Sequence, residues 1–168
     1  MLDDKMFLKQ VLDTTPDQVV VINDSGEIVF VNKSWQNFGE QNDCTCCDVW
    51  EQKNYLVECK KAADNGDEFG LNAYQGILAI IEQQQSDFYF EYPCHSENEK
   101  RWFMMRVVPF ELSDKKYYVI SHQNITERKL AEEQVQKLAA IDGLTDIANR
   151  GFFDTFLEQE WNRCQRLG

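Results

Sequence analysis

The stretch "KKYYVISHQNITERKLAEE", residues 115 to 133, decides the fold because it passes directly from a strand pattern to a helix pattern. Up to Gln123 it is rich in β-branched and aromatic residues, which are typical of a strand. Beyond Asn124 it is rich in strong helix formers, and neither Gly nor Pro occurs before Gly143. The sequence therefore predicts a strand that runs straight into a long helix.

The junction itself has the features of a helix start. Asn124 and Glu127 have the spacing of a capping box, in which the Asn124 side chain caps the helix. Within the helix, Ala131, Val135 and Leu138 recur four and three residues apart, as the core positions of a coiled coil do. This seam covers less than about three heptads, so we expect it to dimerise only weakly by itself.

Two strand patterns precede this junction. The segment "DFYFEYPCH", residues 87 to 95, alternates aromatic residues, and "RWFMMRVVPF", residues 101 to 110, is aromatic and β-branched up to Pro109. In the second segment one alternating set is wholly apolar, whereas the other includes Arg106, so the apolar set is expected to face the core. The expected inner face carries Phe103, Met105 and Val107, together with Tyr118, Ile120 and His122 from the strand at 115–123.

The N-terminal half predicts two more strands. Residues 18 to 32, "QVVVINDSGEIVFVN", contain two β-branched runs on either side of Asp24-Ser25-Gly26, a pattern typical of a hairpin. Helical patterns follow before the three later strands. This order predicts an α+β fold, a five-stranded antiparallel sheet with helices packed on one face.

The helical patterns lie in the middle of the chain. A short helix is expected at 33–40, a second at about 54–63 and a third at 71–83, where Ile77 belongs to an apolar stripe. The segment "NGDEFG", residues 65 to 70, is expected to separate the second from the third.

Composition narrows the class of protein. The chain has 17 basic and 29 acidic residues, a formal net charge of −12, which argues against binding to nucleic acid or to an anionic membrane surface. Two aspartates near the N-terminus stand where a secretory signal would be positively charged, and no apolar run is long enough to span a bilayer. Six cysteines without a signal sequence point to a reducing compartment. We therefore expect a cytoplasmic protein, with no direct membrane contact in this chain.

Residues from about Phe7 to Lys129 resemble a PAS domain, the sensory fold of bacterial signalling proteins. The stretches that carry the resemblance are "VVVINDSGEIVFVN", "NYLVECKKA", "EYPCHSENEKRWF" and "SHQNITERKLAEE". PAS domains commonly end in an Asp-Ile-Thr-Glu-Arg-like turn that starts a signalling helix, and Asn124 here replaces that Asp. The resemblance implies that Asn124, Thr126 and Glu127 relay a signal from the sheet to the helix.

The closing segment, "IDGLTDIANRGFFDTFLEQEWNRCQRLG", resembles the start of a GGDEF domain, the diguanylate cyclase fold that makes cyclic di-GMP. Asp146 stands where that family usually has Gly. The family's metal-binding strand and its Gly-Gly-Asp-Glu-Phe hairpin are not among these residues, so we expect no catalytic residue and no cyclase activity in this chain. The residues that match the family's opening are Asp142, Leu144, Thr145, Asn149 and Arg150.

Together the two resemblances divide the chain into four parts. They are an N-terminal helical cap (1–12), a PAS sensory domain (13–125), a signalling helix (126–141) and an incomplete GGDEF start (142–168). This organisation implies a sensory module that binds a small ligand or cofactor and relays the signal to a diguanylate cyclase domain. It also implies a homodimer formed through the PAS domain and the exit helix.

PAS domains hold their ligand between the inner sheet face and the helices, so the resemblance implies a pocket there. His122 takes the place of a glutamine that contacts the flavin in some relatives. It is either a group that titrates near neutral pH and binds a polar ligand atom, or a packed histidine paired with a backbone carbonyl. The residues expected to line the pocket are Phe103, Met105, Val107, Ile120, His122 and Ile77.

The cofactor stays unknown from the sequence. We expect no flavin photochemistry, because the light-sensing motif around "GRNCRFLQ" has no match, and no haem, because only His95 and His122 are available as axial histidines. Adjacent cysteines rarely bind one ion, so we predict no metal site at Cys44, Cys46 and Cys47. Two alternatives to ligand sensing stay open: a ligand-free dimerisation module, and a thiol or metal sensor built on these cysteines.

Overall fold

The computed structural model describes residues 4–42, 50, 53–96 and 99–139, and further along Phe153, Leu157 and 161–165. Cys44, Cys46 and Cys47 lie outside the described residues, and so do all five positions that match the GGDEF opening. The chain forms two compact units, Met1–Ile125 and Thr126–Gly168.

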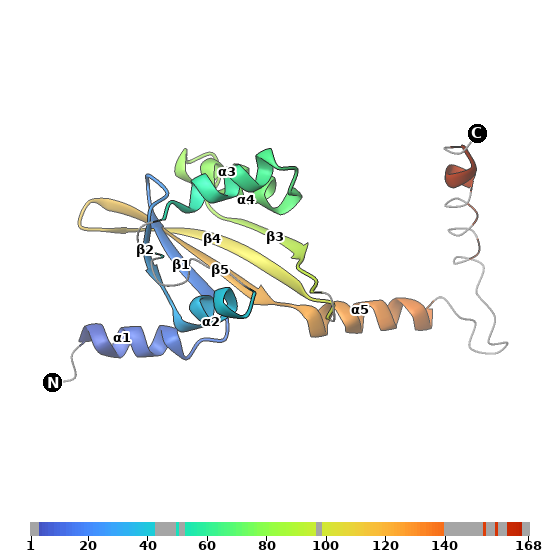
Figure 1. Ribbon diagram of the computed structural model, residues 1–168, viewed down its shortest axis with the longest axis horizontal. Coiled ribbons are helices and arrows are strands. Elements are labelled where there is room, and N and C mark those ends of the chain that lie inside the picture. The colour runs from blue at the N-terminus through green and yellow to red at the C-terminus, as the bar shows by residue number, and fades with distance from the viewer. Residues whose placement is uncertain are drawn as a thin grey trace. The chain divides into compact units, whose positions relative to one another are not determined.

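The first unit is built on one antiparallel sheet. Its strands are β1 (Gln18–Asn23), β2 (Ile28–Val31), β3 (Phe88–Pro93), β4 (Trp102–Leu112) and β5 (Lys115–Asn124), in the spatial order β2-β1-β5-β4-β3 (Figure 1). The two hairpins, β1–β2 and β4–β5, are joined by the pairing of β1 with β5, which sets Gln18 opposite His122. The expected five-stranded antiparallel sheet and the α+β class are confirmed.

Alternation along the strands divides the inner face from the outer face as expected. On β4, Phe103, Met105 and Val107 are buried, whereas the intervening Arg106 is exposed. On β5 the buried set is Tyr118, Ile120 and His122. The inner face is thus continuous across the two central strands.

Helices α2 (Lys33–Gln41), α3 (Tyr55–Asp64) and α4 (Glu68–Ile81) follow the first hairpin, and α1 (Asp4–Asp13) precedes it. Figure 1 shows α3 and α4 lying along one face of the sheet. Each of the three later helices starts with a capping side chain, which accepts a hydrogen bond from a backbone N–H in the first turn. The caps are Asn32, Asn54 and Asp67.

Helix α4 starts three residues earlier than the sequence pattern indicated. The Asp67 carboxylate accepts from the Gly70 N–H at 3.0 Å, so the helix already includes Gly70. This glycine is needed for packing, because a Cβ atom there would lie 2.6 Å from the Ala62 Cβ on α3. The glycine therefore marks a close helix–helix contact and not a helix break.

Asn32 fixes the start of α2 against the sheet. Its side chain is fully buried and makes four hydrogen bonds. The Oδ1 atom accepts from the N–H groups of Val19, at 2.9 Å, and Trp35, at 3.0 Å. The Nδ2 atom donates to the carbonyls of Leu12, at 3.0 Å, and Asp17, at 2.9 Å. One polar side chain thus holds α2 at a defined place beside β1.

The second unit begins with α5 (Thr126–Ala139), which confirms that a helix follows the last strand after a single residue, Ile125. Ile125 is buried in the first unit, and its N–H donates to the Trp102 carbonyl at 2.9 Å. Within the described part of the chain, no helix has both the length and the apolar character needed to cross a bilayer.

Candidate functional site

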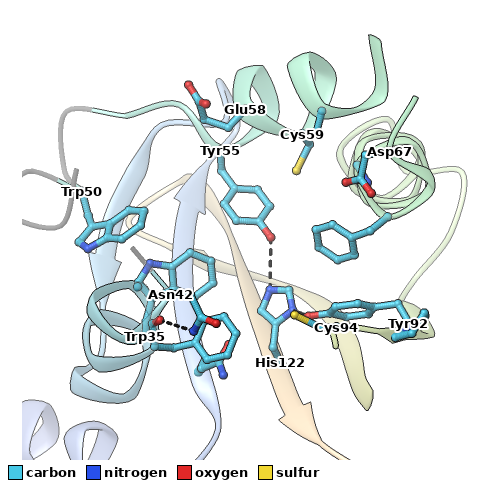
Figure 2. A pocket seen from close by; sticks show the side chains of 17 residues that line it. Trp35, Asn42, Trp50, Tyr55, Glu58, Cys59, Asp67, Tyr92, Cys94 and His122 are labelled. Atoms are coloured by element: carbon cyan, nitrogen blue, oxygen red, sulfur yellow. Dashed lines mark hydrogen bonds between the residues drawn. The ribbon is translucent and has the colours of Figure 1, made fainter. Parts of the chain in front are cut away.

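A cavity of about 490 Å³ lies between the sheet and helices α2, α3 and α4. Its described lining is dominated by aromatic side chains, and His122 of β5 projects into the group (Figure 2). Volumes of this size are typical of sites for small organic molecules. The aromatic lining residues are Trp35, Phe38, Trp50, Tyr55, Phe69 and Tyr92.

The aromatic rings contact one another around His122. The centroid of the Trp35 ring lies 5.6 Å from that of the His122 imidazole and 5.7 Å from that of the Trp50 ring. The two tryptophan rings are nearly perpendicular. On the other side, Phe69 lies 4.3 Å from Tyr92. Such edge-to-face and offset contacts add to the stability that burial alone provides.

His122 is held between two tyrosines. The Tyr55 hydroxyl of α3 lies 3.2 Å from Nε2, and the Tyr92 hydroxyl of β3 lies 2.7 Å from Nδ1. Figure 2 shows the two tyrosines approaching the imidazole from different elements. The histidine is satisfied by these two hydroxyls and not by a backbone carbonyl, and the triad connects one helix with two strands.

Burial keeps the triad uncharged at neutral pH. Desolvation lowers the pKa of His122 from 6.5 to about 4, so His122 does not titrate near neutral pH. The same cause raises the pKa of Tyr55 and of Tyr92 above the usual range of a phenol. A neutral imidazole has one N–H and one acceptor nitrogen, so one tyrosine donates to the ring while the other accepts from it.

The remaining polar groups on the lining are few. Cys59 is buried, and desolvation raises the pKa of its thiol to about 12. Two exposed carboxylates also line the cavity: Glu58 forms an ion pair with Lys61 at 2.9 Å, and Asp67 caps α4. The side-chain amides of Gln18 and Asn42 lie on the lining as well, and Asn42 Oδ1 accepts from Arg101 at 3.0 Å. Neither Lys nor Arg occurs among the described residues that line the cavity.

Of the six residues expected to line the pocket, the cavity lining includes His122. The other five are buried nearby in the packed side-chain core. Sequence reasoning missed Tyr55 and Tyr92 as members of the site, although the strand alternation placed Tyr92 on the same face as Phe88 and Phe90. The five core residues are Ile77, Phe103, Met105, Val107 and Ile120.

The three residues expected to relay a signal lie at the exit from the sheet. Asn124 is the last residue of β5 and is opposite Phe103 on β4. Thr126 is the first residue of α5, and Glu127 is in its first turn. Their role as a relay stays a prediction.

In the described ranges, no three His, Cys, Asp or Glu side chains come together as a metal would require. Cys94 is half-buried on the cavity lining, and His95 packs against Trp102 with ring centroids 4.9 Å apart. The structure therefore gives no position for a metal near the described lining of the cavity.

Comparison by sequence gives a relative that is much longer than this chain. No family model matches the chain. An uncharacterised 104.1-kDa protein from the hypE 3′ region of Rhodobacter capsulatus is 31% identical over 71% of this chain, and the match spans 13% of that protein's length. The relative is thus far longer than the chain, and the shared part is a single segment of it.

Comparison by structure gives the fold. The PAS domain of Bordetella pertussis BvgS has a TM-score of 0.53 and 16% identity, and the match covers 82% of this chain and 97% of that domain. An RNA-binding light-oxygen-voltage receptor has a TM-score of 0.54 and 13% identity, with 80% of this chain and 36% of that receptor covered. At such identities the likeness concerns the fold alone. The chain has the PAS fold.

Proposed function

We propose that this chain is a sensory module that binds a small molecule in the aromatic cavity and passes the signal through β5 and α5. The observation that carries the proposal is the position of His122. It lines the cavity, and it lies two residues before the end of the strand that continues into α5. A change in the surroundings of His122 therefore acts on the last residues of β5, directly before α5 begins.

The triad supports this route because it gathers contacts from several elements. Tyr55 brings α3 to the imidazole and Tyr92 brings β3 to it, and both hydroxyls lie on the cavity lining. A ligand that displaces either tyrosine also changes the hydrogen bonding of β5. Signalling by such a ligand requires that it bind two conformations of the module with different affinity.

We propose further that the receiving domain is a diguanylate cyclase and that the module acts in the cytoplasm as a homodimer. The support for the cyclase is the sequence pattern from Asp142 to Arg150, which resembles the opening of GGDEF domains. The sensory signal would then set how two cyclase domains face each other. The exit helix offers Ala131 and Val135 as an exposed seam for the dimer.

Two measurements test the proposal. Native mass spectrometry of the freshly expressed chain reports bound small molecules and the dimer mass together, and a dimer carrying a co-purified small molecule is the expected result. Joining residues 1–141 to a complete GGDEF domain tests the relay. We expect cyclic di-GMP synthesis to change on ligand binding and to lose that response in the His122→Phe variant. A synthesis rate that ignores the ligand would contradict the relay.

A second function, dimerisation without a ligand, is favoured by the surface of α1. Met6, Phe7 and Leu8 are 62%, 53% and 61% exposed, although all three are large and apolar. Exposed apolar side chains grouped on one helix are typical of an interaction surface. If α1 holds the dimer together, replacing Met6, Phe7 and Leu8 by serine, which keeps the Leu12 and Asp13 contacts to α2, yields monomers in analytical ultracentrifugation, whereas the wild-type chain is a dimer without any ligand.

The alternative of a metal sensor built on Cys44, Cys46 and Cys47 is tested by elemental analysis. Stoichiometric zinc or iron in the purified protein would support it, and protein free of metal would eliminate the metal sensor.

A further inference from the structure

We infer that the ligand of the aromatic cavity is an uncharged, flat ring compound with a hydrogen-bond acceptor, held by the indole N–H groups of Trp35 and Trp50. The inference rests on the proposed sensory function and names the chemical class of its ligand. It follows from the balance of donors and acceptors on the lining, from the charges at its rim and from the shape of its walls.

The two indoles are donors without acceptors. Both Nε1 atoms are buried, and neither has a hydrogen-bond partner among the residues that the structure describes. Both side chains line the cavity, and Figure 2 shows them on the side of α2. A buried N–H without a partner costs free energy, and a ligand that supplies an acceptor removes that cost.

The triad adds a further donor. The neutral imidazole carries one hydrogen and the two tyrosines carry one each, whereas the two bonds at His122 use only two of these three. One tyrosine hydroxyl hydrogen therefore stays available in either tautomer. The nearby Cys59 sulfur is a weak acceptor and satisfies it poorly. The described lining thus has more buried donors than strong buried acceptors.

An anion is disfavoured by the charges at the rim, and a cation makes no use of the indole donors. The carboxylates of Glu58 and Asp67 repel an anion. The guanidinium beside the lining, that of Arg101, already donates to the Cys94 carbonyl and to Asn42 Oδ1. A cation would meet aromatic faces and those two carboxylates, but it would leave the indole N–H groups of Trp35 and Trp50 unpaired. An uncharged acceptor satisfies the donors without a counter-ion.

The walls favour a flat molecule. Trp35 and Trp50 meet almost at right angles, and Phe69 and Tyr92 pack together on the opposite side. Ring faces and edges of this kind contact a planar ring over a large area, as they do one another. A carbonyl or ring nitrogen at the edge of such a molecule lies in the plane in which an indole N–H donates.

The test uses the ¹⁵N-labelled 168-residue chain and four two-ring probes. Coumarin is neutral with a carbonyl acceptor, naphthalene lacks an acceptor, coumarin-3-carboxylate is an anion and N-methylquinolinium is a cation. The chain has four tryptophans, so four indole N–H signals are expected, and the Trp→Phe variants assign them. Trp102 is not among the described lining residues and Trp161 belongs to the second unit, and both serve as internal controls.

We expect coumarin to shift the indole signals of Trp35 and Trp50 and to leave those of Trp102 and Trp161 in place. Its Kd should be about 25-fold lower than that of naphthalene, as two neutral hydrogen bonds imply, and lower than that of either ion. Trp35→Phe and Trp50→Phe should each raise the Kd of coumarin about fivefold and change that of naphthalene by less than about twofold. Trp161→Phe should change neither.

Equal affinity for coumarin and naphthalene, unmoved Trp35 and Trp50 signals, or tighter binding of an ion overturns the ligand class, while ligand sensing itself stands. Failure of every probe to bind overturns the inference as well. Failure of the relay gives a different result. If coumarin binds as expected but cyclic di-GMP synthesis by the GGDEF fusion does not respond, the proposed relay is wrong and the ligand class remains.

Discussion

Because His122 is buried and neutral, we predict that the free energy of unfolding of the PAS unit falls in mild acid. Replacing His122 by a residue that does not titrate should remove this part of the fall. In the folded chain burial lowers the pKa of His122 from 6.5 to about 4. In the unfolded chain the imidazole is in water and titrates at its ordinary pKa. Between these two values the unfolded state binds a proton that the folded state does not, so acid favours unfolding.

The sign and size follow from linkage. The stabilising effect of the depressed pKa is complete above pH 6.5 and is lost as the pH falls from 6.5 towards 4. At about 1.4 kcal/mol per pKa unit, the full effect is on the order of 3 kcal/mol. Between pH 7.5 and 4.5 the free energy of unfolding should drop by about 2.5 kcal/mol from this one group.

The assay is urea unfolding at pH 7.5, 6.5, 5.5 and 4.5, with His122→Gln as the matched variant. Glutamine can still hydrogen-bond to Tyr55 and Tyr92, but it does not titrate. Carboxylates and the exposed His95 contribute equally to both proteins, so the difference between the two curves isolates His122. We expect the wild-type advantage to shrink by about 2.5 kcal/mol across this range. Parallel curves, or an imidazole NMR titration of the folded chain with a midpoint near 6.5, would refute the reasoning.

Three further predictions concern the frame of the cavity. Gly70→Ala places a Cβ 2.6 Å from the Ala62 Cβ and 2.8 Å from the Cys59 carbonyl oxygen. This substitution should lower the free energy of unfolding by about 1–3 kcal/mol in urea titrations. The control Asn72→Ala, on the exposed side of α4, should have a much smaller effect. Asn32→Ala leaves two N–H groups and two carbonyls without their partner, so a loss of at least about 2 kcal/mol is expected by the same titration, and a neutral result would contradict the buried network. With a pKa of about 12, Cys59 is a thiolate in only about one molecule in 10⁴ at pH 8, so mass mapping after brief iodoacetamide treatment should find Cys164, which is exposed, alkylated and Cys59 intact.

The sheet could be predicted from sequence because its signals are local. Period-two alternation identifies the buried face of β4 from Phe103, Met105 and Val107 alone. The hairpins follow from turn residues, and at the β4–β5 turn Ser113 and Asp114 both adopt positive φ angles of 52° and 60°, as a tight two-residue turn requires. The start of α5 follows from the same local change of pattern.

The cavity could not be predicted in the same way, because its lining depends on where the helices lie over the sheet. Most of the inner-face residues that alternation identified belong to one core with Ala73 and Ile77 of α4. The open space lies instead between α2, α3 and the first turn of α4, beside His122 on the buried face of β5. His122 was found because a histidine among apolar residues is conspicuous, whereas Tyr55 on α3 gave no signal beyond its place on an apolar helix face.

The free energy needed to shift the module between two conformations sets how differently the ligand must bind them. Moving an equilibrium from 1:99 to 99:1 requires about 5.5 kcal/mol of differential binding. One or two hydrogen bonds to Trp35 and Trp50 supply on the order of 1–2 kcal/mol of that. The remaining ~4 kcal/mol corresponds to about 160 Å² of apolar surface that is buried in one conformation and open in the other.

Aromatic contact, and not hydrogen bonding, must therefore carry most of the signal. The walls that can supply it are the rings around His122, and of these Trp35 and Phe38 belong to α2 and Phe69 to α4. A small molecule that satisfies the indoles without filling the space between these rings would bind but would leave α5 unchanged. Selectivity for a response thus depends on ring area, whereas selectivity for binding depends on the acceptor.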